Sequence, residues 1–177
     1  TLLPRIGQGF EELNSIGIID SEPPAIHAAQ AQGCSPVINA LRSGAEHPDP
    51  VKPDTIAKSI AIGNPADGFH VLNTIRKSCG SGATASDEEI LDAIQLLART
   101  EGIFTEPAGG TTLAVAVKLI QDGTIPGNES IVVCITGNGY KTTDVIAPRL
   151  EKPTPLGRSL REFESFMKER KSPQPVG

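Results

Sequence analysis

The sequence has very few aromatic side chains. Its 177 residues include no Trp, one Tyr and five Phe, which together make up 3% of the chain. Hydrophobic residues nevertheless account for 38%, so the core must be built from Ile, Val, Leu and Ala. A core of this kind is typical of parallel strands that are covered by helices on both faces. The length is that of one domain, or of part of a larger one.

Long apolar runs and an excess of basic residues are also missing. The longest apolar runs are far shorter than the roughly 18 residues that suggest a membrane-spanning helix, and no signal peptide is recognisable. The net charge is −5 and the sequence pI is about 5.2, whereas a nucleic-acid-binding protein needs a basic face. We therefore expect no membrane and no nucleic-acid partner.

Cysteine is sparse, and the motifs of several enzyme classes are absent. Cys34, Cys79 and Cys134 lie far apart without metal-ligand spacing, so we expect no metal site. Reduced thiols are the simplest interpretation, and they indicate a cytoplasmic protein. The sequence contains no G-x-S-x-G, G-x-G-x-x-G or Walker A motif. The chain starts at Thr1, without Met and within a helical pattern, so we expect a truncated or processed chain.

Helical periodicity and turn residues divide the chain into short elements. The clearest helix follows Ser86 as N-cap, with Glu89 completing a capping box and Gly102 ending the helix. Its apolar stripe comprises Ile90, Ala93, Ile94 and Leu97. Further helices are predicted over 4–17, 37–44, 68–80 and 108–123, with one more near Leu160, Phe163, Phe166 and Met167. Strands are predicted over 25–30 and, from β-branched residues, over 131–135; 103–107 is a short strand or turn, and 55–62 is ambiguous.

This alternation predicts an α/β fold: a three-layer αβα architecture with a mostly parallel sheet. We assign residues 1–152 to the incomplete C-terminal part of a catalytic domain, and 153–177 to a Pro-containing link, an amphipathic helix and a tail. Ligands of such sheets bind beyond the carboxyl ends of the strands. The loops "IGNPADG", "TEPAGGTT" and "TGNGYK" should therefore lie at the ligand edge, where glycines let a flat group approach the backbone. Each loop taken alone could instead be ordinary turn chemistry, and Glu106 could simply cap the following helix.

Four segments in order resemble the C-terminal portion of the threonine synthase family: "QAQGCSP", "IAKSIAIGNP", "DEEILDAIQLLARTEGIFTEPAGGTTLAVAVKLI" and "ESIVVCITGNGYK". The resemblance runs from residue 1 to about 150. It implies the fold of fold-type-II, tryptophan-synthase-β-like enzymes that depend on pyridoxal 5'-phosphate (PLP). The implied reaction is the conversion of O-phospho-L-homoserine and water to L-threonine and phosphate, a carbon–oxygen lyase activity of threonine and amino-acid biosynthesis.

The resemblance also implies which residues bind the cofactor. The Thr136 hydroxyl would meet the pyridine nitrogen, and Ala57 would pack against the cofactor ring. Gly63 and Asn64 would lie in the same cofactor loop as Ala57, with Glu106 behind the residues that contact the cofactor. A hydroxyl can donate to an unprotonated pyridine nitrogen but cannot neutralise a pyridinium as a carboxylate would, which moderates the electron demand of the ring.

The resemblance leaves one essential residue outside the chain. The family's Schiff-base lysine belongs to the N-terminal half, and Lys52, Lys58, Lys77, Lys118 and Lys141 do not match its position, so we expect this chain to contain no catalytic residue and to be inactive alone. The full-length family members are expected to be homodimers. Two alternatives stay open: another fold-type-II lyase such as cysteate synthase or threonine dehydratase, and a non-catalytic αβα module that binds a phosphorylated ligand.

Overall fold

The computed structural model describes residues 2–20, 22–152 and 155–171 of the chain. They form two compact units, which divide between Ile146 and Ala147. The first unit contains α1 (Leu2–Ser15), β1 (Ala28–Ala31), α2 (Pro36–Ser43), η1 (Lys58–Ile60), α3 (Gly68–Lys77), β2 (Gly82–Ala85), α4 (Asp87–Glu101), α5 (Pro107–Gln121), η2 (Gly139–Thr142) and α6 (Thr143–Ile146). The second contains η3 (Ala147–Arg149) and α7 (Leu160–Lys171). Within the described part of the chain, no helix is long and apolar enough to cross a membrane.

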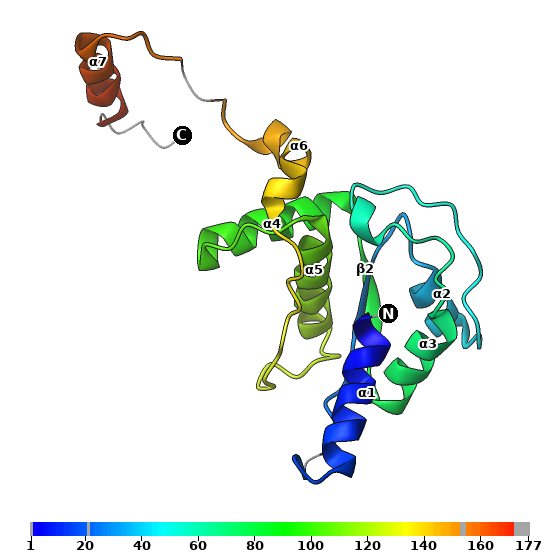
Figure 1. Ribbon diagram of the computed structural model, residues 1–177. Coiled ribbons are helices and arrows are strands. Elements are labelled where there is room, and N and C mark those ends of the chain that lie inside the picture. Colours follow the sequence, from blue (N-terminus) through cyan, green and yellow to red (C-terminus); the bar gives the residue numbers. More distant parts are fainter. Residues whose placement is uncertain (1, 21, 153–154, 172–177) are drawn as a thin grey trace. The chain divides into compact units, whose positions relative to one another are not determined.

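The centre of the first unit is a pair of short parallel strands. β1 and β2 run in register, with Ala28 opposite Gly82 and Ala31 opposite Ala85. Figure 1 shows α5 on one side of the strands and α2 and α3 on the other, so helices cover both faces. This arrangement confirms the predicted αβα class with a parallel sheet.

Two aliphatic clusters fill the space between these layers. The larger lies between the strands, α4 and α5, and the smaller lies between β1, α2 and α3. The predicted stripe of α4 is buried at all four positions: Ile90, Ala93, Ile94 and Leu97.

The caps of α4 agree with the sequence. The Ser86 side chain accepts from the Glu89 N–H, and the Glu89 side chain accepts from the Ser86 N–H, which completes the predicted capping box. Gly102 ends the helix at φ 68°, a left-handed conformation that glycine adopts without strain.

The structure lacks one predicted strand and contains one strand that was not predicted. Residues 131–135 form no strand; Val132 is 91% exposed, and the segment has no strand partner among the described residues. β2 was not predicted, because Gly82–Ala85 has the sequence GATA, without an apolar or β-branched run. The ambiguous region 55–62 contains the short 3-10 helix η1 and no strand.

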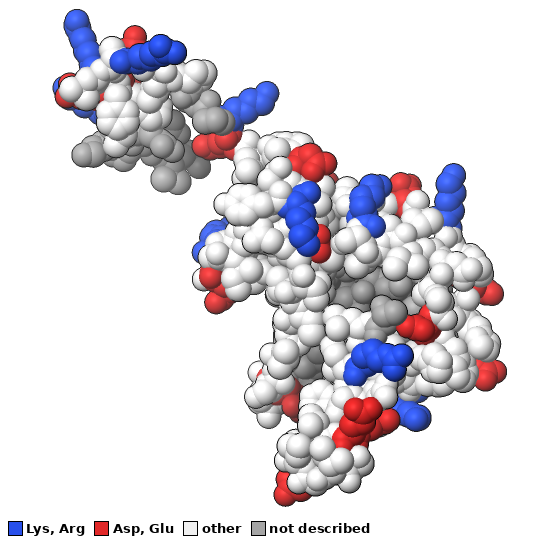
Figure 2. Space-filling model, in the orientation of Figure 1, with Lys and Arg blue, Asp and Glu red and all other residues white. Residues whose placement is uncertain are grey.

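The second unit is a short link and one helix. The Ser159 hydroxyl accepts from the Glu162 N–H in the first turn of α7, which agrees with the predicted C-terminal helix. The described residues divide after Ile146, and the assignment of 1–152 to a catalytic domain remains a prediction. On the face shown in Figure 2, acidic and basic side chains are interspersed in both units.

Candidate functional site

The loops that follow β1 and β2 converge on the first turn of α4. Gln32 N–H donates to Ala85 O at 2.7 Å, and Asp54 N–H donates to Gly33 O at 2.9 Å. The Thr55 hydroxyl and Asp87 Oδ1 are 2.6 Å apart. These bonds tie the predicted cofactor loop to the carboxyl ends of both strands.

Ala57 lies at the base of this loop and is completely buried. Its N–H donates to the Thr55 hydroxyl at 3.2 Å, and its methyl group belongs to the larger aliphatic cluster. The structure therefore places Ala57 in the core at the carboxyl edge, and its packing against a cofactor ring remains a prediction.

Gly63 and Asn64 lie further along the same loop. Val51 N–H donates to Gly63 O at 2.9 Å, and a Cβ at Gly63 would collide with the Val51 carbonyl. The close approach of the two chain segments thus accounts for this glycine. Asn64 is exposed, and no hydrogen bond of the described residues joins either position to Thr136.

The segment 136–139 is held by the residues just before α5. Glu106 N–H and the Thr105 hydroxyl both donate to Gly137 O, at 3.1 and 3.0 Å. Gly139 N–H donates to Phe104 O at 3.0 Å. We call residues 136–139 the ligand turn. Thr136 begins it, with an exposed side chain whose hydroxyl has no hydrogen-bond partner among the described residues.

The two glycines of the ligand turn pack against the chain itself. A Cβ on Gly137 would collide with the Glu106 carboxylate, and a Cβ on Gly139 would lie 2.6 Å from the Phe104 ring. Phe104 in turn meets the Tyr140 ring edge-to-face at 5.4 Å. In the structure the two glycines lie close to Glu106 and Phe104, respectively, and the approach of a flat ligand to their backbone remains a prediction.

Glu106 is the least expected feature of this site. It occupies the N-cap position of α5 with no hydrogen bond from its side chain to the helix, so the simple capping interpretation is wrong. Gly109 and Gly110 N–H groups donate instead to the Glu106 backbone oxygen, at 3.0 and 3.1 Å. Glu106 is only 8% exposed, and its carboxylate has no hydrogen-bond or ion-pair partner among the described residues. The motif alone could not reveal this, because burial depends on the packing of the ligand turn.

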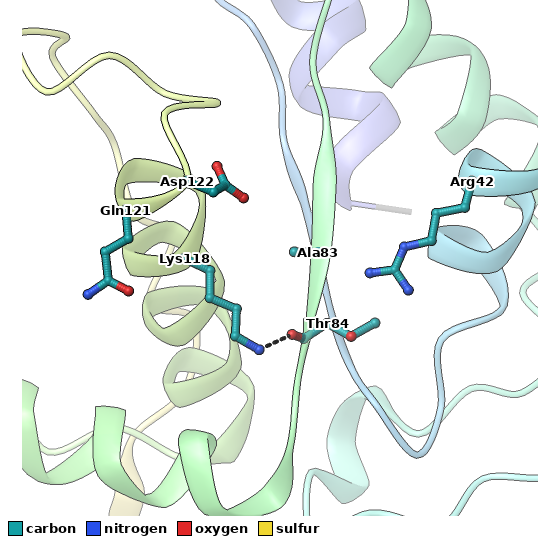
Figure 3. A pocket seen from close by; sticks show the side chains of 6 residues that line it. All are labelled: Arg42, Ala83, Thr84, Lys118, Gln121 and Asp122. Carbon is teal, nitrogen blue, oxygen red and sulfur yellow. Dashed lines mark hydrogen bonds between the residues drawn. The ribbon is translucent and has the colours of Figure 1, made fainter.

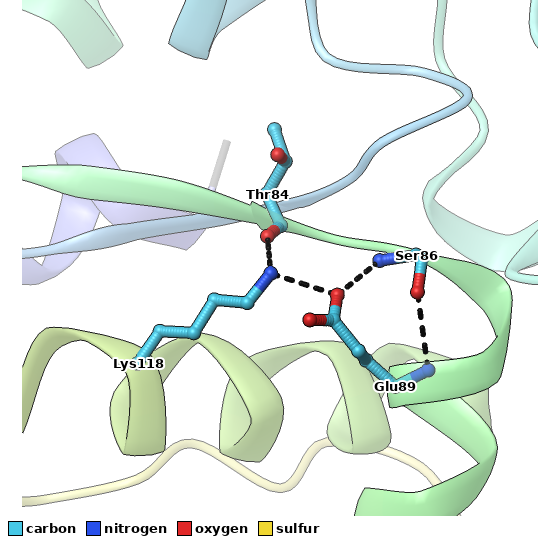
Figure 4. A network of polar contacts seen from close by, with 4 residues as sticks. All are labelled: Thr84, Ser86, Glu89 and Lys118. Carbon is cyan, nitrogen blue, oxygen red and sulfur yellow. Dashed lines mark hydrogen bonds and ion pairs between the residues drawn. The ribbon is translucent and has the colours of Figure 1, made fainter. Parts of the chain in front are cut away.

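Two of the candidate lysines, Lys118 and Lys77, form ion pairs in the structure. Lys118 donates to Thr84 O at 2.8 Å and to Glu89 Oε2 at 2.7 Å, joining α5, β2 and the capping box of α4 (Figure 4). The Glu89 carboxylate has its pKa lowered, chiefly by the hydrogen bond from Lys118 and next by the Ser86 N–H. Lys77 lies 3.9 Å from Glu11 in an exposed ion pair, and the remaining candidates, Lys52, Lys58 and Lys141, are exposed.

An open cavity of about 440 Å³ lies beside β2, away from the ligand turn. Figure 3 shows its lining: Arg42, Ala83, Thr84, Lys118, Gln121 and Asp122. Lys118 lies 11 residues after Pro107 on α5, or about 16 Å along the helix. The cavity contains none of the predicted site residues, and the described residues include no cluster of three potential metal ligands.

The ligand turn presents a hydrogen-bonding group of the kind that the nitrogen of a pyridine ring needs. A hydroxyl without a protein partner stands at the strand-end edge of the first unit, on a backbone fixed by three hydrogen bonds. A hydroxyl can either donate or accept a hydrogen bond, so Thr136 fits a ring nitrogen in either protonation state. The Thr136 hydroxyl is thus compatible with the ring nitrogen of PLP.

Comparison with known proteins gives a consistent result. The family model for "Pyridoxal-phosphate dependent enzyme" matches residues 6–137. Threonine synthase of Methanocaldococcus jannaschii is 39% identical over 168 residues, which cover 94% of this chain and 41% of that protein. Threonine synthase of Methanosarcina acetivorans is 39% identical over 159 residues, or 89% of this chain and 39% of that protein.

A solved structure of maize serine racemase has a TM-score of 0.59 at 17% identity, covering 82% of this chain and 45% of that one. At this low identity, the structural similarity supports the fold and nothing further. The chain spans about two fifths of the length of the two threonine synthases.

Proposed function

The chain belongs to the pyridoxal-phosphate dependent enzyme family, and we propose that it is the C-terminal part of a threonine synthase. The complete protein would convert O-phospho-L-homoserine and water to L-threonine and phosphate. Identity of 39% over 94% of the chain to a protein named threonine synthase supports this choice within the family. The observation in the structure that carries the proposal is the Thr136 hydroxyl, which has no partner among the described residues and stands on a turn held by three hydrogen bonds.

The ligand turn and the loop of Ala57, Gly63 and Asn64 have separate physical roles in this proposal. When bound, PLP supplies an electron sink for chemistry at the substrate. Thr136 holds the ring nitrogen, and the hydrogen bonds of Gly137 and Gly139 hold the backbone of the turn on which its hydroxyl stands. Ala57 keeps a small side chain beneath the ring, and Gly63 and Asn64 shape the neighbouring loop.

The remaining catalytic parts lie outside this chain. The lysine that carries the cofactor and the contacts to the substrate phosphate would come from the rest of the protein. We infer that the complete protein acts as a cytoplasmic homodimer on a small-molecule substrate, and that this chain has no activity by itself.

The first test replaces Thr136 in the complete protein. Thr136→Asp puts a carboxylate against the ring nitrogen, and we expect a shifted cofactor absorbance and a turnover lowered about tenfold or more, the size of one charge-assisted hydrogen bond. Thr136→Ser keeps the hydroxyl and is the matched control, with an absorbance close to wild type.

Activity would be measured as phosphate and L-threonine formed from O-phospho-L-homoserine. An unchanged absorbance and turnover in Thr136→Asp would show that the ring nitrogen is held elsewhere. Ammonia release from L-threonine, without any reaction of O-phospho-L-homoserine, would assign the protein to the dehydratase alternative.

A further inference from the structure

The Asp87 carboxylate holds the first residues of the cofactor loop, residues 55–64, against the first turn of α4. Asp87 Oδ1 accepts from the Thr55 hydroxyl at 2.6 Å. The Ile56 N–H donates to the same carboxylate, at 3.3 Å from Oδ1 and 3.2 Å from Oδ2. Two consecutive residues of the loop are therefore bound by one side chain, which lies 32 positions after Thr55 in the sequence.

The Thr55 hydroxyl connects this carboxylate to Ala57. Thr55 is only 3% exposed, and its hydroxyl accepts from the Ala57 N–H at 3.2 Å. An ionised carboxylate can only accept, so the hydroxyl directs its proton to Asp87 and keeps its lone pairs for the Ala57 N–H. The Ala57 carbonyl in turn accepts from the Ile60 N–H at 3.1 Å. Both backbone groups of Ala57 are therefore fixed, one of them through the bond between Thr55 and Asp87.

We propose that Asp87 is a positioning residue, which acts through the Thr55 hydroxyl to hold the cofactor loop in the shape that binds PLP. The inference rests on the proposed function, in which this loop lies beneath the cofactor ring. Asp87 itself makes no contact with the cofactor in this proposal. A loop that is already ordered avoids the entropic cost of being ordered when PLP binds.

The place of Asp87 in the fold suits this role. The cofactor loop has little regular structure of its own, since only the three residues of η1 are helical. By contrast, α4 is held by its capping box and by four buried side chains. A carboxylate in the first turn of a helix is also stabilised by the helix dipole. Asp87 thus attaches an irregular loop to a well-anchored helix.

The direct test removes the Thr55 hydroxyl in the complete protein. Thr55→Val keeps the size and branching of the side chain but can neither donate to Asp87 nor accept from Ala57. PLP is titrated into the protein while its absorbance is recorded, and we expect binding weakened roughly tenfold, as for one lost hydrogen bond. Thr55→Ser keeps the hydroxyl and is the matched control, with an affinity close to wild type.

A second pair of variants tests the carboxylate. Asp87→Ala should weaken PLP binding at least as much as Thr55→Val. Glu88→Ala removes the neighbouring exposed carboxylate from the same helical turn and should leave the affinity unchanged. The double variant Thr55→Val/Asp87→Ala should bind PLP no more weakly than Asp87→Ala alone, because both losses interrupt one path. Losses that multiply would contradict a path through Thr55.

A purely structural role predicts a different pattern. It would lower the urea unfolding free energy of the PLP-free variants and leave the PLP affinity of the folded proteins unchanged, which would overturn the proposal. Equal effects of Asp87→Ala and Glu88→Ala would overturn it as well. Should Asp87→Ala fail to fold, the comparison of Thr55→Val with Thr55→Ser decides alone, and equal affinities there would show that the proposal is wrong.

The same titration separates this inference from the proposed function. Wild-type protein that binds no PLP would refute both together. Normal loading of the wild type with silent variants would refute only the role of Asp87 and Thr55.

Discussion

His27 shows how one side chain can make the fold sensitive to pH. Its Nδ1 accepts a hydrogen bond from the Ser81 N–H at 3.1 Å, next to the first ladder bond, from Ala28 N–H to Ser81 O. Burial lowers the pKa of His27 below its ordinary value of 6.5. Protonation would remove the acceptor and place a charge at the start of the only sheet in the described part of the chain.

We therefore predict that His27 destabilises the complete protein under mildly acidic conditions. Because the folded state has the lower pKa, the unfolded state binds more protons below pH 6.5, and stability falls as the pH drops from 6.5 through the folded pKa. His27→Asn provides a side-chain acceptor that does not titrate. Urea unfolding at pH 7.5 and 5.5 should show a smaller loss of unfolding free energy in His27→Asn than in wild type. Equal losses in both proteins would show that His27 does not contribute.

At the scale of secondary structure, Lys118 connects three elements that are distant in sequence. Thr84 O on β2, the capping box of α4 and the last turn of α5 meet at its ammonium group. In a parallel pair, alternate backbone groups face opposite edges. Ala28 N–H and Gln32 N–H donate to Ser81 O and Ala85 O, so Thr84 O faces away from β1. Lys118 thus provides a donor at the outer edge of the sheet.

We predict that Lys118→Met lowers the unfolding free energy of the complete protein by about 1 kcal/mol. The residue makes charge-assisted bonds to a carbonyl and a carboxylate, but both side chains are more than a third exposed, which reduces the gain through solvent screening. The control is Lys77→Met, which breaks the exposed pair with Glu11 and should cost less than about 0.5 kcal/mol. Equal losses in urea unfolding would mean that Lys118 is an ordinary surface lysine.

The sequence predicted those elements whose signals are local. The capping box of α4, its apolar stripe and the glycine at its end all depend on neighbouring residues, and all are confirmed. β2 was not predicted, because its small residues reflect close packing against other parts of the fold and not a local strand pattern. A Cβ on Gly82, for example, would lie 2.6 Å from Ile38 Cδ1. At the site, too, only features with a local sequence signal could be predicted. The "TGNGYK" motif located Thr136, while the burial of Glu106 required the fold.

At the scale of the whole molecule, the described residues include strand edges without neighbours. β1 pairs with β2 on one side only, and the backbone groups of Ala29 and Ala31 face the other side. Residues 131–135 have the β-branched character of a central strand but form no ladder in the described structure. Ile135 Cγ2 would lie 3.2 Å from a Cβ on Gly109, so this segment packs on α5, the helix that also covers β1 and β2. The chain spans about two fifths of the length of the two threonine synthases. We therefore infer that a strand from the remaining part of the complete protein pairs with residues 131–135.

This inference predicts that residues 131–135 become a strand only in the complete protein. Their amides should exchange with deuterium at least about 100-fold more slowly there than in the isolated 177-residue chain, because ladder bonds must open before exchange. The amides of α4 are the internal reference, since the capping box and aliphatic cluster that hold this helix lie entirely within the chain. In parallel, borohydride reduction with PLP should leave a stable pyridoxyl-lysine on the complete protein and none on the isolated chain. Slow exchange at 131–135 in the isolated chain would show that no outside strand is needed. A pyridoxyl-lysine on the isolated chain would instead place the cofactor lysine among residues 1–177.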